Sequence, residues 1–324
     1  MSETLSTRGQ ALVSLLRRVA DTKQPPAAML YSLAELLAEE GRLDDFADVF
    51  RQAFLRMPKL RPSLDETSTA PLAARARKLR GLAQALIDRG VRYAPVLAAL
   101  AISEAKLGDA AAVKRLVDYR SFLRCGPLAQ GVGAGAARYN AALEREIRSK
   151  LVFHSERSPR PLRRGWRHGR LLESKLPACR ELEREIRARI GRYIAELPDD
   201  PGHPFIASRP KRFSLESWAV VAGSDTHIES HIHLRAWLSG VYYVSSGELG
   251  SDQGWLRVGP PAGVQPAEGW EERLVEPAPG TLVLMPGYFF HSTTTTRSER
   301  DRISIAFNVT PIELAEAESP SDDY

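Results

Sequence analysis

Cysteine is scarce in this sequence, and long apolar runs are missing from it. The 324 residues include two cysteines, Cys125 and Cys179, which lie far apart and lack the spacing of metal ligands. Neither a disulfide framework nor a zinc ribbon is therefore expected. The N-terminus has no basic-then-apolar signal region, and no apolar run approaches the ~18 residues of a membrane span. These absences exclude disulfide-rich secreted and membrane-spanning proteins, and they predict a soluble, cytoplasmic protein.

The excess of positive charge is small but unevenly distributed. Lys and Arg total 45 against 40 Asp and Glu, which gives a net charge of +5. Basic residues crowd the stretch 157–170, and acidic residues gather in the tail 313–323. A basic stretch can hold nucleic acid or an acidic peptide. We interpret this one as a solvated linker or as the partner of acids elsewhere in the fold, so nucleic acid is not an expected partner.

Residues 1–150 have the pattern of an α-helical domain. Apolar residues recur at intervals of three and four in 28–58 and again in 95–127, and Gly41 or Gly108 interrupts each block. Each block predicts two helices joined by a tight turn. The two glycines are separated by about two units of 34 residues, the length of a tetratricopeptide repeat. A tetratricopeptide-like array of stacked helix pairs is predicted, with a generic helical bundle as the alternative.

The composition of the chain changes after residue 150. Residues 151–176 are rich in arginine and proline, which predicts a basic linker or extended arm. An amphipathic pattern in 177–197 predicts a helix. Five β-branched or aromatic runs bounded by turn residues follow it, at 213–221, 237–244, 255–258, 281–285 and 303–309. They predict a sandwich or barrel in a second domain, 177–324, and so an α+β chain of two domains.

Two histidines in this second domain have the spacing of metal ligands. His231 and His233 are two positions apart, so on an extended strand both side chains leave the same face. Two imidazoles on one face can bind one ion, and a third ligand must come from elsewhere. His291 is placed to supply it, since it follows a predicted strand and a Pro-Gly turn. Nitrogen ligands on one side, with the opposite positions open, suit a redox-active iron.

An arginine begins the last predicted strand, eleven positions after His291. Period-two geometry puts Arg302 and Ser304 on one face of that strand. A buried guanidinium beside a hydroxyl is a natural receptor for a carboxylate, because it donates two charge-assisted hydrogen bonds. The sequence therefore predicts a carboxylate site next to a metal site.

The stretch Trp218–Val309 resembles the Fe(II)/2-oxoglutarate-dependent dioxygenase superfamily, and within it a bacterial and phage branch related to prolyl hydroxylases. The matching segments, in the superfamily's order, are 231–233, 238–244, 279–286, 291 and 302–308. The resemblance implies a double-stranded β-helix, of the jelly-roll or cupin-like kind, that binds Fe(II) and the co-substrate 2-oxoglutarate. It also implies that His231 and His291 are iron ligands and that Arg302 binds the distal carboxylate of 2-oxoglutarate.

Two more residues are predicted to contact 2-oxoglutarate. Ser239 and Tyr243 share one face of the strand 237–244, and a tyrosine there could donate a hydrogen bond to the carboxylate that Arg302 and Ser304 bind. The alternative for Tyr243 is a core aromatic. Trp218, Trp237 and Asn308 are predicted to be packing or strand-end residues.

Position 233 departs from the superfamily, which most often has Asp or Glu there. His233 is predicted as the third ligand, because three-histidine iron sites occur in other oxygenases. A neutral imidazole in place of a carboxylate leaves the site one negative charge short. The alternative is a two-histidine site completed by Asp225, His227 or Glu229 from the preceding loop.

The function that this resemblance implies is the hydroxylation of a substrate coupled to decarboxylation of 2-oxoglutarate to succinate. A peptide or protein side chain presented by the helical domain is the predicted substrate, because stacked helix pairs form concave surfaces that hold extended peptides. The first alternative is the same chemistry on a small molecule or amino acid in a biosynthetic pathway. The second is an inactive module that binds metal or peptide. The sequence does not indicate an oligomeric state.

Overall fold

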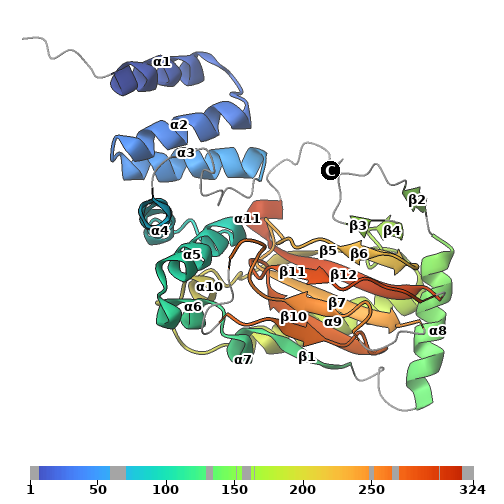
Figure 1. The fold of residues 1–324 in the computed structure, drawn as a ribbon. Helices are drawn as coiled ribbons and strands as arrows, with labels where there is room; N and C mark the ends of the chain where they lie inside the picture. Colours follow the sequence, from blue (N-terminus) through green and yellow to red (C-terminus); the bar gives the residue numbers. More distant parts are fainter. Residues whose placement is uncertain are drawn as a thin grey trace, which may run out of the picture.

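The structure is a computed structural model of a helical region followed by an antiparallel sheet domain (Figure 1). It describes residues 7–58, 71–128, 134–150, 152–154, 162–163, 165–247, 252–264, 270–298 and 300–315. None of the described helices has the length and apolar character needed to cross a membrane.

Within the described residues, seven helices make up the first part of the chain. They are α1 (Thr7–Asp21), α2 (Ala27–Glu39), α3 (Leu43–Arg56), α4 (Leu72–Asp88), α5 (Ala94–Leu107), α6 (Ala110–Leu116) and α7 (Tyr119–Phe122). Both predicted helix–turn–helix blocks are confirmed. Gly41 joins α2 to α3 at φ 71°, and Gly108 joins α5 to α6 at φ 76°, in the left-handed region that glycine adopts without strain. Their assignment as tetratricopeptide repeats stays a prediction.

The sheet domain contains one large sheet and two small ones. The seven-stranded sheet has the order β1-β10-β7-β12-β5-β4-β2, a second sheet has the order β11-β8-β9, and β3 pairs with β6. The strands are β1 (Arg124–Pro127), β2 (Val152–His154), β3 (Leu162–Arg163), β4 (Gly165–Gly169), β5 (Phe213–Ala222), β6 (His227–Ile228), β7 (Leu238–Ser245), β8 (Leu256–Val258), β9 (Arg273–Val275), β10 (Thr281–Pro286), β11 (His291–Thr293) and β12 (Arg302–Pro311). All five predicted strands are present as β5, β7, β8, β10 and β12.

The predicted boundaries at 150 and 176 do not separate the helices from the sheet. β1, inside the segment predicted to be wholly helical, pairs with β10. β4, inside the predicted linker, pairs with β5, and β2 pairs with β4. Edge strands expose unpaired backbone groups, and these upstream strands satisfy those groups at both sides of the sheet. Residues 155–161 and 164 of the basic stretch, and residues 316–323 of the acidic tail, lie outside the described residues.

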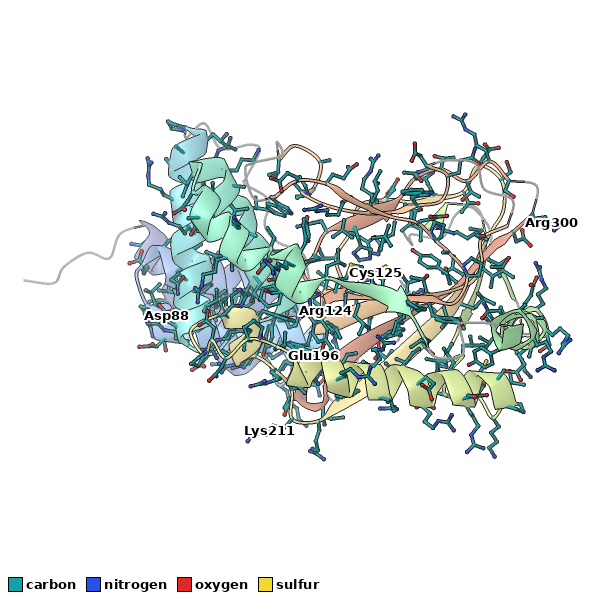
Figure 2. The ribbon with its side chains drawn as sticks, turned by 90° about the horizontal axis from the view of Figure 1, so that it is seen from below. Asp88, Arg124, Cys125, Glu196, Lys211 and Arg300 are labelled. Atoms are coloured by element: carbon teal, nitrogen blue, oxygen red, sulfur yellow. The ribbon has the colours of Figure 1, made fainter. Side chains whose placement is uncertain are left out.

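One face of the large sheet is covered by helices. Ile303, Ile305, Phe307 and Val309 of β12 lie on this face and are fully buried. The remaining helices are α8 (Ala134–Arg148), α9 (Pro177–Ala195), α10 (Pro204–Ala207) and α11 (Ile312–Ala315). Helix α9, which the amphipathic pattern predicted, runs along the sheet (Figure 2). The opposite face of the sheet, which we call the site face, carries the even-numbered residues of β12.

Gly240 on β7 packs against the ring of Phe307 on the helix-covered face. A Cβ atom at Gly240 would lie 2.3 Å from Phe307 Cζ and 2.8 Å from the carbonyl oxygen of Val283. Replacement of Gly240 by Ala should therefore lower the free energy of unfolding by about 1–3 kcal/mol, as overpacking does in a dense core. Urea unfolding followed by circular dichroism measures this change.

Gly126→Ala is the matched control, because a Cβ at this strand glycine would meet nothing within 4 Å. It should change the free energy of unfolding by less than about 0.5 kcal/mol. Equal effects of the two substitutions would contradict the packing described for Gly240.

Candidate metal centre and carboxylate site

Three histidine side chains converge at one point beside the large sheet. One ligand atom from each of His231, His233 and His291 lies within 4.8 Å of the others, and this is the one such cluster of His, Cys, Asp and Glu in the described part of the chain. His231 and His291 form an isolated β-bridge, in which each backbone N–H donates to the other's carbonyl oxygen at 3.0 Å. The N–H of His233 donates to the carbonyl of Gly287 at 2.9 Å. Backbone pairing therefore holds all three positions together.

The imidazole rings are oriented by backbone carbonyl groups. His231 Nδ1 lies 2.8 Å from the carbonyl oxygen of Glu229, and His291 Nδ1 lies 2.9 Å from that of Phe289. Because a carbonyl oxygen only accepts, each Nδ1 carries the proton and each Nε2 keeps a lone pair. This is the arrangement in which metal-binding histidines are usually held.

The spacing of the ring nitrogens fits one shared ion. The Nε2 atoms of His233 and His291 are 3.2 Å apart. Two nitrogen ligands at right angles around a metal, with bonds of about 2.1 Å, would be about 3.0 Å apart. Burial, together with the neighbouring His231, lowers the pKa of His291 to about 3. The His291 imidazole is thus neutral over most of the pH range, as a metal ligand must be.

The alternative ligands do not join this cluster. Asp225, His227 and Glu229 precede the cluster in the chain, but none of them belongs to the group of converging ligand atoms. Asp225 is exposed and has φ 60°, His227 lies in β6, and Glu229 is exposed and contributes its backbone carbonyl to His231. The donor set of the described cluster is three imidazoles with no carboxylate.

A buried arginine lies on the site face at the start of β12. Arg302 is 1% exposed, and its Nη1 donates to the carbonyl oxygen of Gly254. Its Nε has no hydrogen-bond partner among the described residues, and no described acid forms an ion pair with it. Burial lowers the pKa of Arg302, and the neighbouring Tyr243 opposes this shift. A buried guanidinium without a counter-ion is costly, so this position needs an anion.

Ser304 and Tyr243 lie beside Arg302, but Ser239 does not. Ser304 is directly opposite Tyr243 across the β12–β7 pair, and both are buried. Burial raises the pKa of Tyr243 to about 12, although the charge of Arg302 opposes this shift, so its hydroxyl stays a proton donor. Ser239 is opposite Asn308, which is four residues beyond Ser304 on β12, or about 13 Å along the strand. Its hydroxyl donates to the carbonyl of Phe307 at 3.4 Å.

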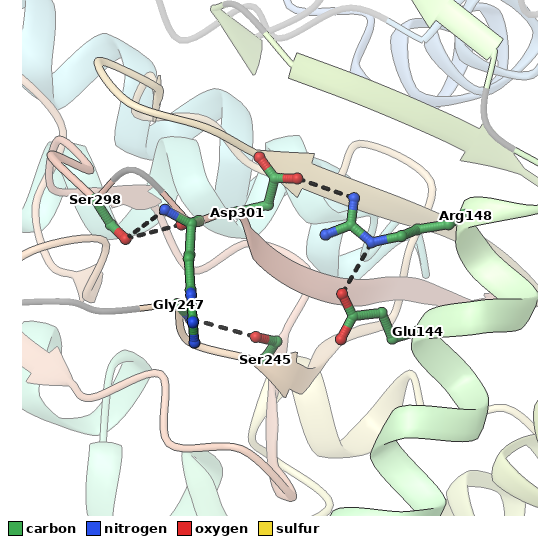
Figure 3. Close-up of polar contacts among 7 residues, drawn as sticks. Glu144, Arg148, Ser245, Gly247, Ser298 and Asp301 are labelled. Carbon is green, nitrogen blue, oxygen red and sulfur yellow. Dashed lines mark hydrogen bonds and ion pairs between the residues drawn. The ribbon is translucent and has the colours of Figure 1, made fainter.

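A network of polar contacts fixes the chain just before Arg302 (Figure 3). Arg148 of α8 donates to Glu144 at 2.9 Å and to Asp301 at 3.0 Å. Nearby, Gly247 has φ 67°, and a Cβ there would lie 2.5 Å from the carbonyl oxygen of Arg300. The end of β7 and the beginning of β12 are thereby held close to each other. This supports a fixed position for the Arg302 side chain.

Two residues that sequence reasoning assigned to packing lie at the site. The ring of Trp218 is centred 5.7 Å from that of His233. Asn308 shares the site face with Arg302 and Ser304, and its Oδ1 is buried with no hydrogen-bond partner among the described residues. The period-two alternation along 302–308 could have placed Asn308 on the same strand face as Arg302 and Ser304. Nothing local in the sequence indicates that Trp218 would lie beside His233.

Comparison with known proteins identifies a family for part of the chain. Residues 216–308 match the family model described as "Putative 2OG-Fe(II) oxygenase". The matched segment contains the three histidines, Arg302 and Ser304, so the match confirms the predicted resemblance over these residues. Among curated proteins, no relative matches the chain.

Several solved structures are similar to this chain at low sequence identity. A prolyl-4-hydroxylase from Pseudomonas putida is 19% identical with a TM-score of 0.42, over 62% of this chain and 98% of that one. A prolyl hydroxylase from Trichoplax adhaerens, in complex with a hypoxia inducible factor peptide fragment, is 11% identical with a TM-score of 0.43, over 67% and 94%. HygX from Streptomyces hygroscopicus, with nickel and 2-oxoglutarate bound, is 15% identical with a TM-score of 0.40, over 61% and 86%. Because these TM-scores lie below 0.5, the site rests on the family match and on the geometry above.

The geometry of the cluster predicts that His291 binds metal, and substitution of this residue tests the prediction. His291→Ala removes a buried candidate ligand and should weaken metal binding by more than the 10- to 100-fold that loss of a supporting residue typically costs. Anaerobic titration with Co(II), read from its visible absorption, measures this affinity. His227→Ala is the control and should bind Co(II) like the unsubstituted protein. Equal affinities for the two variants would contradict the assignment of His291.

Proposed function

We propose that this chain is an Fe(II)- and 2-oxoglutarate-dependent oxygenase, the class of enzyme whose family model residues 216–308 match. The observation that carries the proposal is the pairing of two features on one side of the sheet. Three imidazoles converge there, and a buried arginine nearby has no described counter-ion. A structural histidine cluster would not need the arginine, and a structural arginine would have an acidic partner.

The residues present fit both groups that such an enzyme requires. His231, His233 and His291 would hold iron through their Nε2 atoms, and the remaining positions would be open to co-substrate and dioxygen. Bound iron supplies the redox chemistry in which dioxygen and 2-oxoglutarate are consumed and a hydroxyl group reaches the substrate. Arg302 would bind the distal carboxylate of 2-oxoglutarate, with Ser304 and Tyr243 donating further hydrogen bonds. Ser239 is too far along the strand to bind that carboxylate.

The protein's own part in the reaction is to orient these groups and to exclude water. The carbonyl groups of Glu229 and Phe289 fix the tautomers of His231 and His291. Burial keeps the hydroxyl of Tyr243 protonated and the guanidinium of Arg302 away from water, where its attraction for a carboxylate is strongest. The double-stranded β-helix topology belongs to the same proposal.

A peptide or protein side chain is the substrate that this proposal favours over a small molecule. The histidine cluster is connected to the helical region by Arg235, two residues after His233. Arg235 donates to the carbonyl of Leu55 at the end of α3 and to that of Leu314 in α11. These contacts place the end of α3 next to the segment that carries the histidine cluster. The helical region is proposed to present the substrate, as a tetratricopeptide-like array would.

Turnover of 2-oxoglutarate tests the proposal directly. Protein reconstituted anaerobically with Fe(II) and 2-oxoglutarate should form succinate when oxygen is admitted. Arg302→Lys keeps the positive charge but loses the bidentate hydrogen-bond donor. The KM for 2-oxoglutarate should therefore rise about 10- to 100-fold, the size expected for losing a hydrogen bond to a charged group. Leu72→Ala, an exposed position on α4, is the control and should leave KM unchanged. If the unsubstituted protein forms no succinate even with lysate peptides present, the proposed enzymatic activity is contradicted.

Position 233 offers a second test of the site. His233→Asp introduces the ligand that the superfamily most often has and adds one negative charge to the metal centre. Metal binding should be retained, because a carboxylate also ligates iron. The affinity for the dianion 2-oxoglutarate should fall, because the new charge repels it. Anaerobic titrations of metal and then of 2-oxoglutarate measure the two effects. Unchanged affinities for both would show that residue 233 does not face the metal.

A further inference from the structure

The site face of the large sheet is organised in sets of residues that lie opposite one another across neighbouring strands. One set joins Ser304 of β12 to Tyr243 of β7 and Val220 of β5. The next set consists of Trp218, Ala306, Val241 and Val283. The set after that consists of Glu216, Asn308, Ser239 and Met285. The polar carboxylate site is therefore followed by an apolar set and then by a second polar set.

Exposure increases along this face, away from Arg302. Arg302, Ser304 and Tyr243 are buried, at 1%, 4% and 2%. In the following two sets, Trp218, Val241, Ala306 and Asn308 are partly buried and Glu216 is exposed, whereas Ser239, Val283 and Met285 stay buried. His231 and His233 are partly buried as well, whereas His291 is buried. The face is thus buried at the carboxylate end and towards β10, and partly exposed along β5 and β12 beside His233.

Trp218 provides an apolar surface next to the histidine cluster. Its ring is tilted by 32° from that of His233, with the centres 5.7 Å apart. The residue opposite it on β12 is Ala306, which has a small side chain, and Trp218 itself is partly buried. A partly exposed tryptophan offers a large, rigid contact area, and such residues often anchor a bound ligand.

Asn308 provides a hydrogen-bond acceptor one set further along. Its Oδ1 is buried and has no partner among the described residues, although a buried carbonyl oxygen without a donor is costly. Asn308 is two positions beyond Ala306 on β12, about 7 Å along the strand. That is the length of two residues in an extended peptide.

We propose that Trp218, Ala306, Val241 and Asn308 form the substrate subsite of this enzyme, and that it binds an extended peptide segment without acidic side chains. An apolar side chain would pack on Trp218 beside the metal, and a backbone N–H two residues away would donate to Asn308 Oδ1. This inference rests on the proposed function and names the part of the site face that selects its substrate.

The character of the subsite argues for a peptide over other ligands. The residues of its two sets contain no cationic side chain, and the exposed Glu216 is anionic, so an acidic substrate would lack a counter-ion there and would be repelled. A sugar would need many hydrogen-bonding groups, whereas this surface combines an apolar platform with one unsatisfied acceptor. A peptide supplies both an apolar side chain and an N–H at the required spacing.

Capped tripeptides of the form acetyl-Gly-X-Gly-amide, with each amino acid in turn at X, are the probe. Peptides with an apolar X should stimulate succinate formation by the Fe(II)-loaded protein and gain one oxygen atom in mass. Trp218→Ala should lower kcat/KM for the stimulating peptides about 10-fold or more, as loss of an aromatic anchor does. Trp218→Phe keeps an aromatic face and should retain most of the stimulation.

Asn308 is tested in the same assay with two variants of similar size. Asn308→Leu removes the acceptor and should raise the KM for the peptides about 10-fold, whereas Asn308→Asp keeps an acceptor oxygen and should raise it less. Anaerobic binding of Co(II) and 2-oxoglutarate by each variant shows whether the metal and carboxylate sites are intact.

The outcomes separate this inference from the proposed function. Succinate formation that no capped tripeptide stimulates would overturn the peptide subsite and leave the oxygenase assignment in place. Stimulation that Trp218→Ala and Asn308→Leu leave unchanged would also overturn it. Absence of succinate under every condition would instead contradict the proposed function.

Discussion

The alternation of side chains along β12 is the constraint on which the rest of the structure depends. This strand lies between β5 and β7 in the large sheet, and its two faces carry different chemistry. Ile303, Ile305, Phe307 and Val309 are fully buried on the helix-covered face. The even-numbered residues, from Arg302 to Asn308, lie on the site face. A shift of one residue in register would exchange the two sets, so the stability of the core also fixes the position of the site.

Charge balance connects the two halves of the proposed site. Arg302 brings a positive charge into the protein interior, and the three imidazoles add no negative charge to offset it or the charge of a bound divalent metal. A dicarboxylate that reaches both the metal and Arg302 neutralises both. An acid at position 233 would supply part of that negative charge from the protein. With His233 in its place, the co-substrate of the proposed reaction would supply it, and the affinity for 2-oxoglutarate would depend strongly on electrostatics.

Much of this architecture could be predicted because it depends on local periodicity. Glycines at 41 and 108 marked two helix turns, and both have the positive φ that such turns require. The five β-branched or aromatic runs are strands. The predicted linker was wrong in part, because β4 pairs with β5 through backbone hydrogen bonds that an Arg- and Pro-rich composition does not reveal. The prediction that Ser239 and Tyr243 share one strand face is correct. Ser239 is nevertheless four residues along β7 from Tyr243, the residue opposite Ser304.

The sequence by itself determined which side chains share a face: His231 with His233, and Arg302 with Ser304, since a strand alternates every second residue. Only the tertiary structure decided what those faces meet. The bridge between His231 and His291 joins positions sixty residues apart, and Trp218 lies beside His233 because β5 is paired with β12 in one particular register. Backbone dihedrals fix alternation locally. Strand register, and the lack of an ion-pair partner for Arg302 among the described residues, depend instead on contacts between segments that are distant in the chain.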